Sequence, residues 1–185
     1  MSGSLLLWMG LALAVFWGVG LYNRLMRMRA RGLDALGSVE KYLRRYADLV
    51  SVHLSVPGAS PTQAHPVSTE HLPPEWVHLL AILQTLERAL KDARGMPLAV
   101  EPVARLTQAL TALHEAWERL CDAPADLAGP PVPDTMRLQW DAVTLKVEAA
   151  RGGFNRILTK YNEAIDQFPA RLVAGAMGFK PAGLL

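Results

Sequence analysis

The sequence predicts an all-α protein, in which an N-terminal transmembrane helix is followed by an antiparallel four-helix bundle with two long and two shorter helices. Three observations support this prediction. The first 23 residues carry no charged side chain, the rest is rich in Leu and Ala at spacings of three and four, and proline-rich stretches divide it. We therefore expect a membrane anchor over residues 1–23 and a helical bundle over residues 24–180.

The anchor is predicted from residues 5–22, which are almost wholly apolar. At about 1.5 Å per residue this run can cross a hydrocarbon core of roughly 30 Å with help from its flanks. Trp8 and Trp17 are residues that favour membrane interfaces. A cleaved signal peptide is the first alternative, but no positive charge precedes the run. A buried core helix is the second, but such helices rarely lack a polar face. We favour an uncleaved anchor.

The charges that flank the run predict its orientation. Lys and Arg close to a membrane helix stay on the cytoplasmic side. Here they all follow the run, at Arg24, Arg27, Arg29, Arg31 and Lys41. The sequence therefore predicts a single-pass protein of the inner (cytoplasmic) membrane, with the N-terminus outside and the C-terminal domain in the cytoplasm.

Small residues recur at every fourth position of the predicted anchor, at Gly10, Ala14 and Gly18. This spacing lets two membrane helices approach closely and would support a homo-oligomer through this face. The alternative is that Gly and Ala are simply common in membrane helices. We favour that alternative.

Length and charge limit the classes of partner. Without the anchor, about 160 residues remain, which fits one domain. The net charge of +2 is too small to indicate a nucleic-acid partner, and the basic residues beside the anchor favour anionic lipid. The single cysteine, Cys121, cannot form a disulfide within the chain, in agreement with a reducing compartment.

The first half of the bundle region begins with one long helix that continues out of the membrane over residues 24–56. Its apolar residues are spaced by threes and fours, as in the seam of a coiled-coil-like bundle. Gly32 and Gly37 each weaken this helix by about 1 kcal/mol relative to Ala. Five prolines then predict a loop over residues 57–74, because proline cannot continue a helix.

The second half contains three more predicted helices. Residues 75–94 and 98–121 each carry one apolar face, and a second break follows over residues 122–134. The last long helix is expected over residues 135–168, with Asp134 as its N-cap. The apolar stretch at residues 172–179 is then expected to pack back on the bundle.

Two runs of residues resemble those of the LemA family. The closing run contains an aromatic-Asn pair repeated after seven residues, and the opening run follows the anchor without a gap. Their residues are Arg151, Phe154, Asn155, Tyr161, Asn162, Phe168, Pro169, Gly178 and Phe179 in the closing run, and Asn23, Arg45 and Asp48 in the opening run. The two runs cover roughly residues 22–56 and 136–179.

The chain departs from the family pattern at three places, one of which is the proline-rich segment at residues 57–74. Thr144 stands where a Glu is usual, and Asp48-Leu49 continues into Val50 rather than Ile-Pro. The resemblance implies a bacterial single-pass membrane protein with an antiparallel helical bundle. It brings no catalytic residues with it.

The aromatic-Asn pairs also have a physical interpretation of their own. Phe154 and Tyr161 lie two turns apart on one helix face and are expected in the core. Asn155 and Asn162 flank that face, where their amides could fix the register of neighbouring helices. A ligand-binding groove is the alternative, and we favour core and register.

No pattern in the sequence indicates catalysis. The five histidines lack the spacing of metal ligands, and Cys121 has only His114 two turns away. We therefore expect no enzyme and no cofactor, but an interaction or scaffold module at the cytoplasmic membrane. Its expected partners are the lipid bilayer and other membrane or cytoplasmic proteins. The alternatives are an envelope-maintenance protein with its bundle outside the cytoplasm, and a bundle that senses a small ligand.

Overall fold

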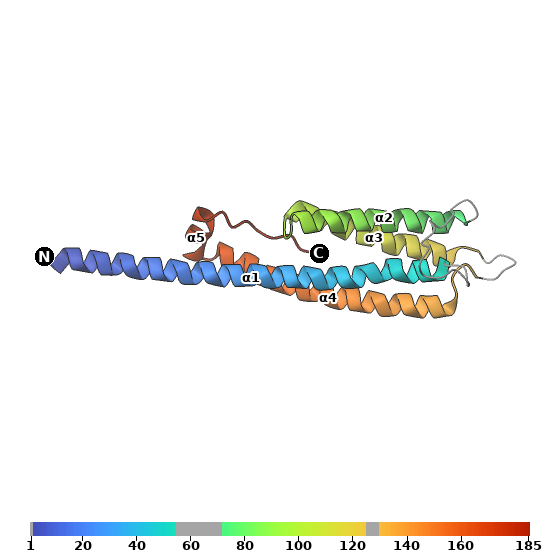
Figure 1. The fold of residues 1–185 in the computed structure, drawn as a ribbon, viewed down its shortest axis with the longest axis horizontal. Helices are drawn as coiled ribbons and strands as arrows, with labels where there is room; N and C mark the ends of the chain where they lie inside the picture. The colour runs from blue at the N-terminus through green and yellow to red at the C-terminus, as the bar shows by residue number, and fades with distance from the viewer. Residues whose placement is uncertain (1, 55–71, 125–129) are drawn as a thin grey trace, which may run out of the picture.

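The computed structural model describes residues 2–54, 72–124 and 130–185, with side chains from residue 7 onward. Four long helices lie antiparallel to their neighbours, and the first extends far beyond the others (Figure 1). The predicted proline-rich loop at 57–74 falls largely on residues 55–71, outside the described part of the chain. The predicted break at 122–134 contains residues 125–129, which also lie outside it.

Helix α1 runs unbroken from Ser2 to Leu54, as predicted. Its 53 residues span about 80 Å at 1.5 Å per residue. The first part is long and apolar enough to cross a membrane by length and composition, and little of it is buried against the protein. Its large apolar side chains are exposed at Leu7, Trp8, Met9, Leu11, Leu13, Val15, Phe16, Trp17, Val19 and Tyr22. From Leu25 onward, the same helix buries one face.

Helices α2 (Pro74–Gly95) and α3 (Val100–Asp122) form a close pair, within two residues of their predicted ends. Proline opens α2 where no amide donor is needed. The short turn between the helices contains Leu98, which adopts a positive φ of 68° while its side chain is buried. Packing of this side chain compensates for a backbone conformation that leucine rarely adopts.

Helix α4 (Asp134–Asp166) pairs closely with α1, and a short helix α5 (Ala170–Ala176) follows it. Asp134 was predicted as the N-cap, which is wrong. Pro133 takes the cap position, and Asp134 is the first helical residue, where its charge suits the helix dipole. The predicted return of residues 172–179 is confirmed, because Ala174 is buried and Phe179 packs against the core.

The core joins the α1–α4 pair to the α2–α3 pair. Trp117 of α3 stacks on Trp140 of α4 with ring centroids 3.9 Å apart, and Tyr46 of α1 lies 4.4 Å from the same ring. The predicted all-α bundle is therefore confirmed. Its packed part continues beyond residue 180, since Ala182 and Leu185 are also buried.

Two glycines of α1 provide a matched test of this packing. A Cβ on Gly32 would lie 2.8 Å from Cδ2 of Leu158, whereas a Cβ on Gly37 would meet nothing within 4 Å. Both sites gain the same helix propensity on substitution. We expect Gly37→Ala to raise the free energy of unfolding by about 1 kcal/mol. Gly32→Ala should gain clearly less, or lose stability, because Leu158 must move.

The measurement is thermal unfolding of the full chain in detergent, followed by circular dichroism. An equal gain at both positions would contradict the close approach of α1 and α4 at Gly32.

Candidate functional site

Two asparagines of α4 hold the C-terminal segment of the chain. Nδ2 of Asn162 donates to the carbonyl of Ala182 at 2.9 Å, and its Oδ1 accepts from the amide of Ala182 at 2.8 Å. Asn155 does the same for Leu185, at 2.6 Å and 2.8 Å. Each side-chain amide thus pairs with both backbone groups of one residue, and we call this arrangement the asparagine clamp.

The spacing of the two asparagines matches the spacing of the residues that they hold. Seven residues of helix rise about 10.5 Å. Three residues of extended chain span about 10 Å. A step from Asn162 to Asn155 along α4 therefore equals a step from Ala182 to Leu185 along the tail. This match explains physically why the aromatic-Asn pair recurs after seven residues.

The aromatic partners of the asparagines lie in the core, and one of them also binds the tail. Phe154 is fully buried, and the hydroxyl of Tyr161 donates to the carbonyl of Lys180 at 3.1 Å. Burial raises the pKa of Tyr161, and the nearby Arg29 acts in the opposite direction. The prediction that both aromatic residues lie in the core is confirmed. The prediction that the amides fix register between helices is wrong, because they bind the tail.

The tail also contacts the second helix pair. The amide of Gly183 donates to the carbonyl of Leu98 at 2.9 Å. A Cβ at Gly183 would lie 2.9 Å from Cα of Val100, which is backbone and cannot move aside. The extended tail therefore lies between α4 and the turn that joins α2 to α3, and glycine is required where it passes Val100.

The remaining residues of the predicted motif do not gather at the clamp. Asn23, Arg45 and Asp48 are exposed on α1. Arg151 is half-buried, with Nη1 at 3.5 Å from Glu148.

The corner after α4 contains the other motif residues. Phe168 is 83% exposed, and a cis peptide bond joins it to Pro169. Gly178 ends α5 with a φ of 71°, which glycine adopts without strain. Phe179 then packs edge-on against Tyr22 of α1, with ring centroids 5.7 Å apart.

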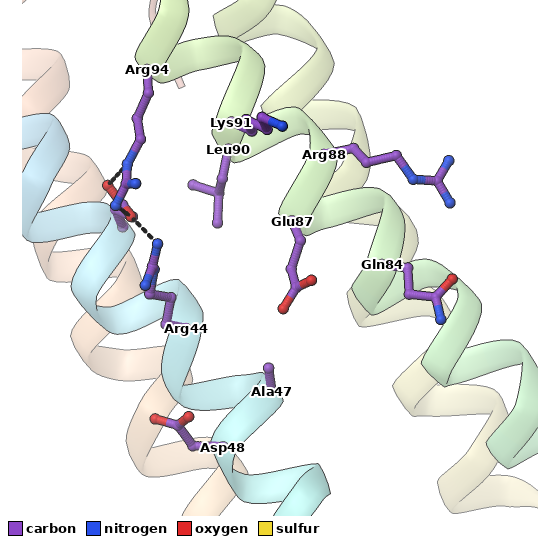
Figure 2. A pocket seen from close by; sticks show the side chains of 10 residues that line it. Arg44, Ala47, Asp48, Gln84, Glu87, Arg88, Leu90, Lys91 and Arg94 are labelled. Atoms are coloured by element: carbon purple, nitrogen blue, oxygen red, sulfur yellow. Dashed lines mark hydrogen bonds and ion pairs between the residues drawn. The ribbon is translucent and has the colours of Figure 1, made fainter. Parts of the chain in front are cut away.

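A polar cleft between α1 and α2, with a volume of about 740 Å³, is a feature that the sequence did not predict (Figure 2). Glu40 of α1 is buried beside it. Arg94 of α2 donates to its carboxylate from Nε at 2.7 Å and also from Nη2. Arg44 lies 2.9 Å from the same carboxylate. These two arginines compensate the buried charge, and Arg94 ties α2 to α1.

The rest of the cleft presents both signs of charge. Figure 2 shows Glu87 and Leu90 pointing into the space between the helices, with Asp48 on the opposite side. Arg88 and Lys91 add positive charge along α2. Asp48 is the one residue of the predicted motif that lines the cleft. No spacing in the sequence pairs α1 with α2, so only the fold brings these side chains together.

A second polar cluster lies inside the bundle. The hydroxyl of Tyr46 lies 2.9 Å from Oγ1 of Thr144 and 3.3 Å from Nε2 of His114. Thr144 donates its own proton to the carbonyl of Trp140. Burial raises the pKa of Tyr46 and lowers the pKa of His114. Thr144, where a Glu is usual in the family, thus satisfies the tyrosine with a neutral hydroxyl.

The described residues supply no candidate metal site and no candidate thiol nucleophile. Within residues 2–54, 72–124 and 130–185, no three His, Cys, Asp or Glu side chains come together as metal ligands. Burial raises the pKa of the Cys121 thiol, and the nearby Arg137 opposes this. A protonated thiol is a poor nucleophile. The expected lack of an enzymatic activity stays a prediction.

Comparison with known proteins agrees with the resemblance seen in the sequence. Residues 86–185, more than half of the chain, match the family model of the LemA family. The chain belongs to the LemA family. No curated protein and no solved structure matches it. The part matched to LemA contains α3, α4, α5 and the tail, and therefore the whole asparagine clamp, whereas the opening run at residues 22–56 lies outside it.

The asparagine clamp is testable by isosteric substitution. Asn162→Asp keeps the acceptor for the amide of Ala182 but places an oxygen against its carbonyl. We expect a loss of about 1–3 kcal/mol in the free energy of unfolding, as for two hydrogen bonds. Hydrogen exchange over residues 180–185 should become faster. Asn23→Asp, at an exposed asparagine of α1, is the control. Unchanged exchange in the Asn162 variant would contradict the clamp.

The half-buried His114 predicts a dependence of stability on pH. Because the pKa of His114 is lower in the folded chain than its ordinary value of 6.5, the unfolded chain binds the proton more readily. Its contribution to stability is therefore complete above pH 6.5 and is lost as the pH falls toward the lower folded pKa.

His114→Gln removes this titration, so the melting temperature should fall less between neutral and acidic pH. The exposed His78 supplies the control as His78→Gln. Equal pH dependence in the wild type and both variants would disprove the assignment.

Proposed function

We propose that this LemA-family chain is a membrane-anchored, non-enzymatic scaffold whose bundle lies in the cytoplasm. The observation that carries the proposal is that α1 is one unbroken helix, Ser2–Leu54. Its first part exposes apolar side chains to the surroundings, and its second part forms one edge of the bundle. The same rigid element would therefore join the membrane to the surface that binds partners.

The position of positive charge supports the orientation. Arg24, Arg27 and Arg31 are exposed and line one shallow hollow of α1 directly after the charge-free run. Such residues favour the cytoplasmic face and anionic headgroups. A bundle that follows them lies on the same side of the membrane.

The polar cleft is the surface that we propose for partner binding. It is lined by α1 and α2, and it holds charges of both signs (Figure 2). Mixed charge of this kind favours a partner with complementary charges over a nucleic acid, because complementary charges determine which partner binds. Arg88 and Lys91 are exposed and form no ion pair within residues 7–54, 72–124 and 130–185, so they are available to a partner.

The experiment is site-specific photocrosslinking of the full chain in cells. A photoreactive amino acid at Gln84, in the cleft, should capture a small and reproducible set of cytoplasmic or inner-membrane proteins. The double variant Arg88→Glu and Lys91→Glu should reduce that capture several-fold. The matched control is Leu145 of α4, which is 73% exposed and lies outside the cleft.

Two results would count against the proposal. Equal capture from Gln84 and Leu145, unaffected by the charge reversal, would exclude the cleft as the binding surface. Capture of periplasmic proteins alone would reverse the topology and favour the alternative, in which the bundle lies outside the cytoplasm.

A further inference from the structure

An apolar patch lies on the surface of α5 and the corner before it. Three large apolar side chains within ten residues are exposed there. Phe168 is 83% exposed, Leu172 66% and Met177 54%. The opposite face of α5 is the one that packs on the bundle, through Ala170 and Ala174. The α5 patch, defined as Phe168, Leu172 and Met177, is therefore left uncovered by the described part of the chain.

The fold places the α5 patch beside the anchor. Helix α4 is antiparallel to α1, so the end of α4 lies toward the N-terminal part of α1, and α5 crosses there (Figure 1). The ring contact between Phe179 and Tyr22 shows how far along α1 this corner lies. Tyr22 is the last aromatic residue of the charge-free run, two residues before Arg24. The α5 patch thus lies where the anchor ends.

Arginines lie on two sides of α1 near Tyr22. At 3.6 residues per turn, Arg24, Arg27 and Arg31 lie on the face of α1 opposite to Tyr22 and Leu25. Tyr22 and Leu25 are on the side where α5 packs. On that other side, α5 carries the exposed Arg171, next to Leu172 in the sequence. Positive side chains therefore occur on both sides of α1 close to the end of the charge-free run.

We infer that the α5 patch inserts into the interface of an anionic bilayer and forms a second membrane contact beside the anchor. Apolar side chains mixed with arginine are the composition that lies in this interface. Continuity with the anchor selects lipid as the occupant, because α5 contacts α1 and the ring contact of the nearby Phe179 with Tyr22 sets α5 beside the end of the exposed apolar part of α1. The second contact would prevent the bundle from tilting freely about the end of the anchor. The inference rests on the proposed membrane anchoring.

The test measures the depth of single spin labels. The full chain, with Cys121→Ser, is reconstituted into vesicles of mixed phosphatidylcholine and phosphatidylglycerol. A nitroxide is attached at Leu172→Cys, and its collisions with oxygen and with a water-soluble nickel complex are compared. Phe16→Cys reports the anchor, and Lys160→Cys, exposed on α4, reports water. At Leu172, the ratio of oxygen to nickel collisions should exceed that at Lys160 several-fold.

A second variant tests the patch as a unit. Phe168→Ser should lower the ratio at Leu172 toward that at Lys160 and leave the ratio at Phe16 unchanged. Because both side chains are exposed, neither substitution removes a core contact.

Three outcomes would overturn the inference. A ratio at Leu172 equal to that at Lys160, with Phe16 still in lipid, would refute the second contact and leave the anchor intact. An aqueous ratio at Phe16 would refute the proposed anchoring itself. A label at Leu172 that is shielded from both reagents would show that protein, such as a second copy of the chain, covers the patch instead of lipid.

Discussion

The close antiparallel contact between α1 and α4 determines where the rest of the chain lies. The two helices approach so closely at Gly32 that a Cβ there would collide with Leu158. Because α1 also carries the exposed apolar segment, this pairing returns the end of α4 to the end of that segment. The corner at Phe168, the short α5 and the contact between Phe179 and Tyr22 all follow from that position.

The asparagine clamp adds to that contact, because it joins the two helix pairs at the end nearer the exposed apolar segment of α1. A side-chain amide offers one donor and one acceptor in the geometry of a peptide group. It can therefore satisfy both backbone groups of an extended residue, which neither a carboxylate nor an apolar side chain can do. At the other end of the bundle, stacked tryptophans and the Tyr46 cluster join the same two pairs. The two helix pairs are thus joined by amide hydrogen bonds at one end of the bundle, and by aromatic stacking and the Tyr46 cluster at the other.

The sequence predicted the four long helices because apolar spacing and proline are local signals. It did not predict α5, whose seven residues are too few to show a helical period. The role of Asn155 and Asn162 was missed for another reason. Their partners lie 20 and 30 residues away in an extended segment without a pattern of its own. The polar cleft combines residues of α1 and α2 that only tertiary packing brings together.

An unbroken α1 also fixes the direction in which the cleft faces. Glu40 follows Tyr22 by eighteen residues, which is five turns at 3.6 residues per turn and a rise of about 27 Å. Glu40 therefore lies on the same side of α1 as Tyr22, directly along the helix. A proline or a flexible joint after the anchor would let the bundle rotate and would lose this relation. Since α1 has neither, any rotation of its apolar segment about the helix axis turns the cleft by the same angle.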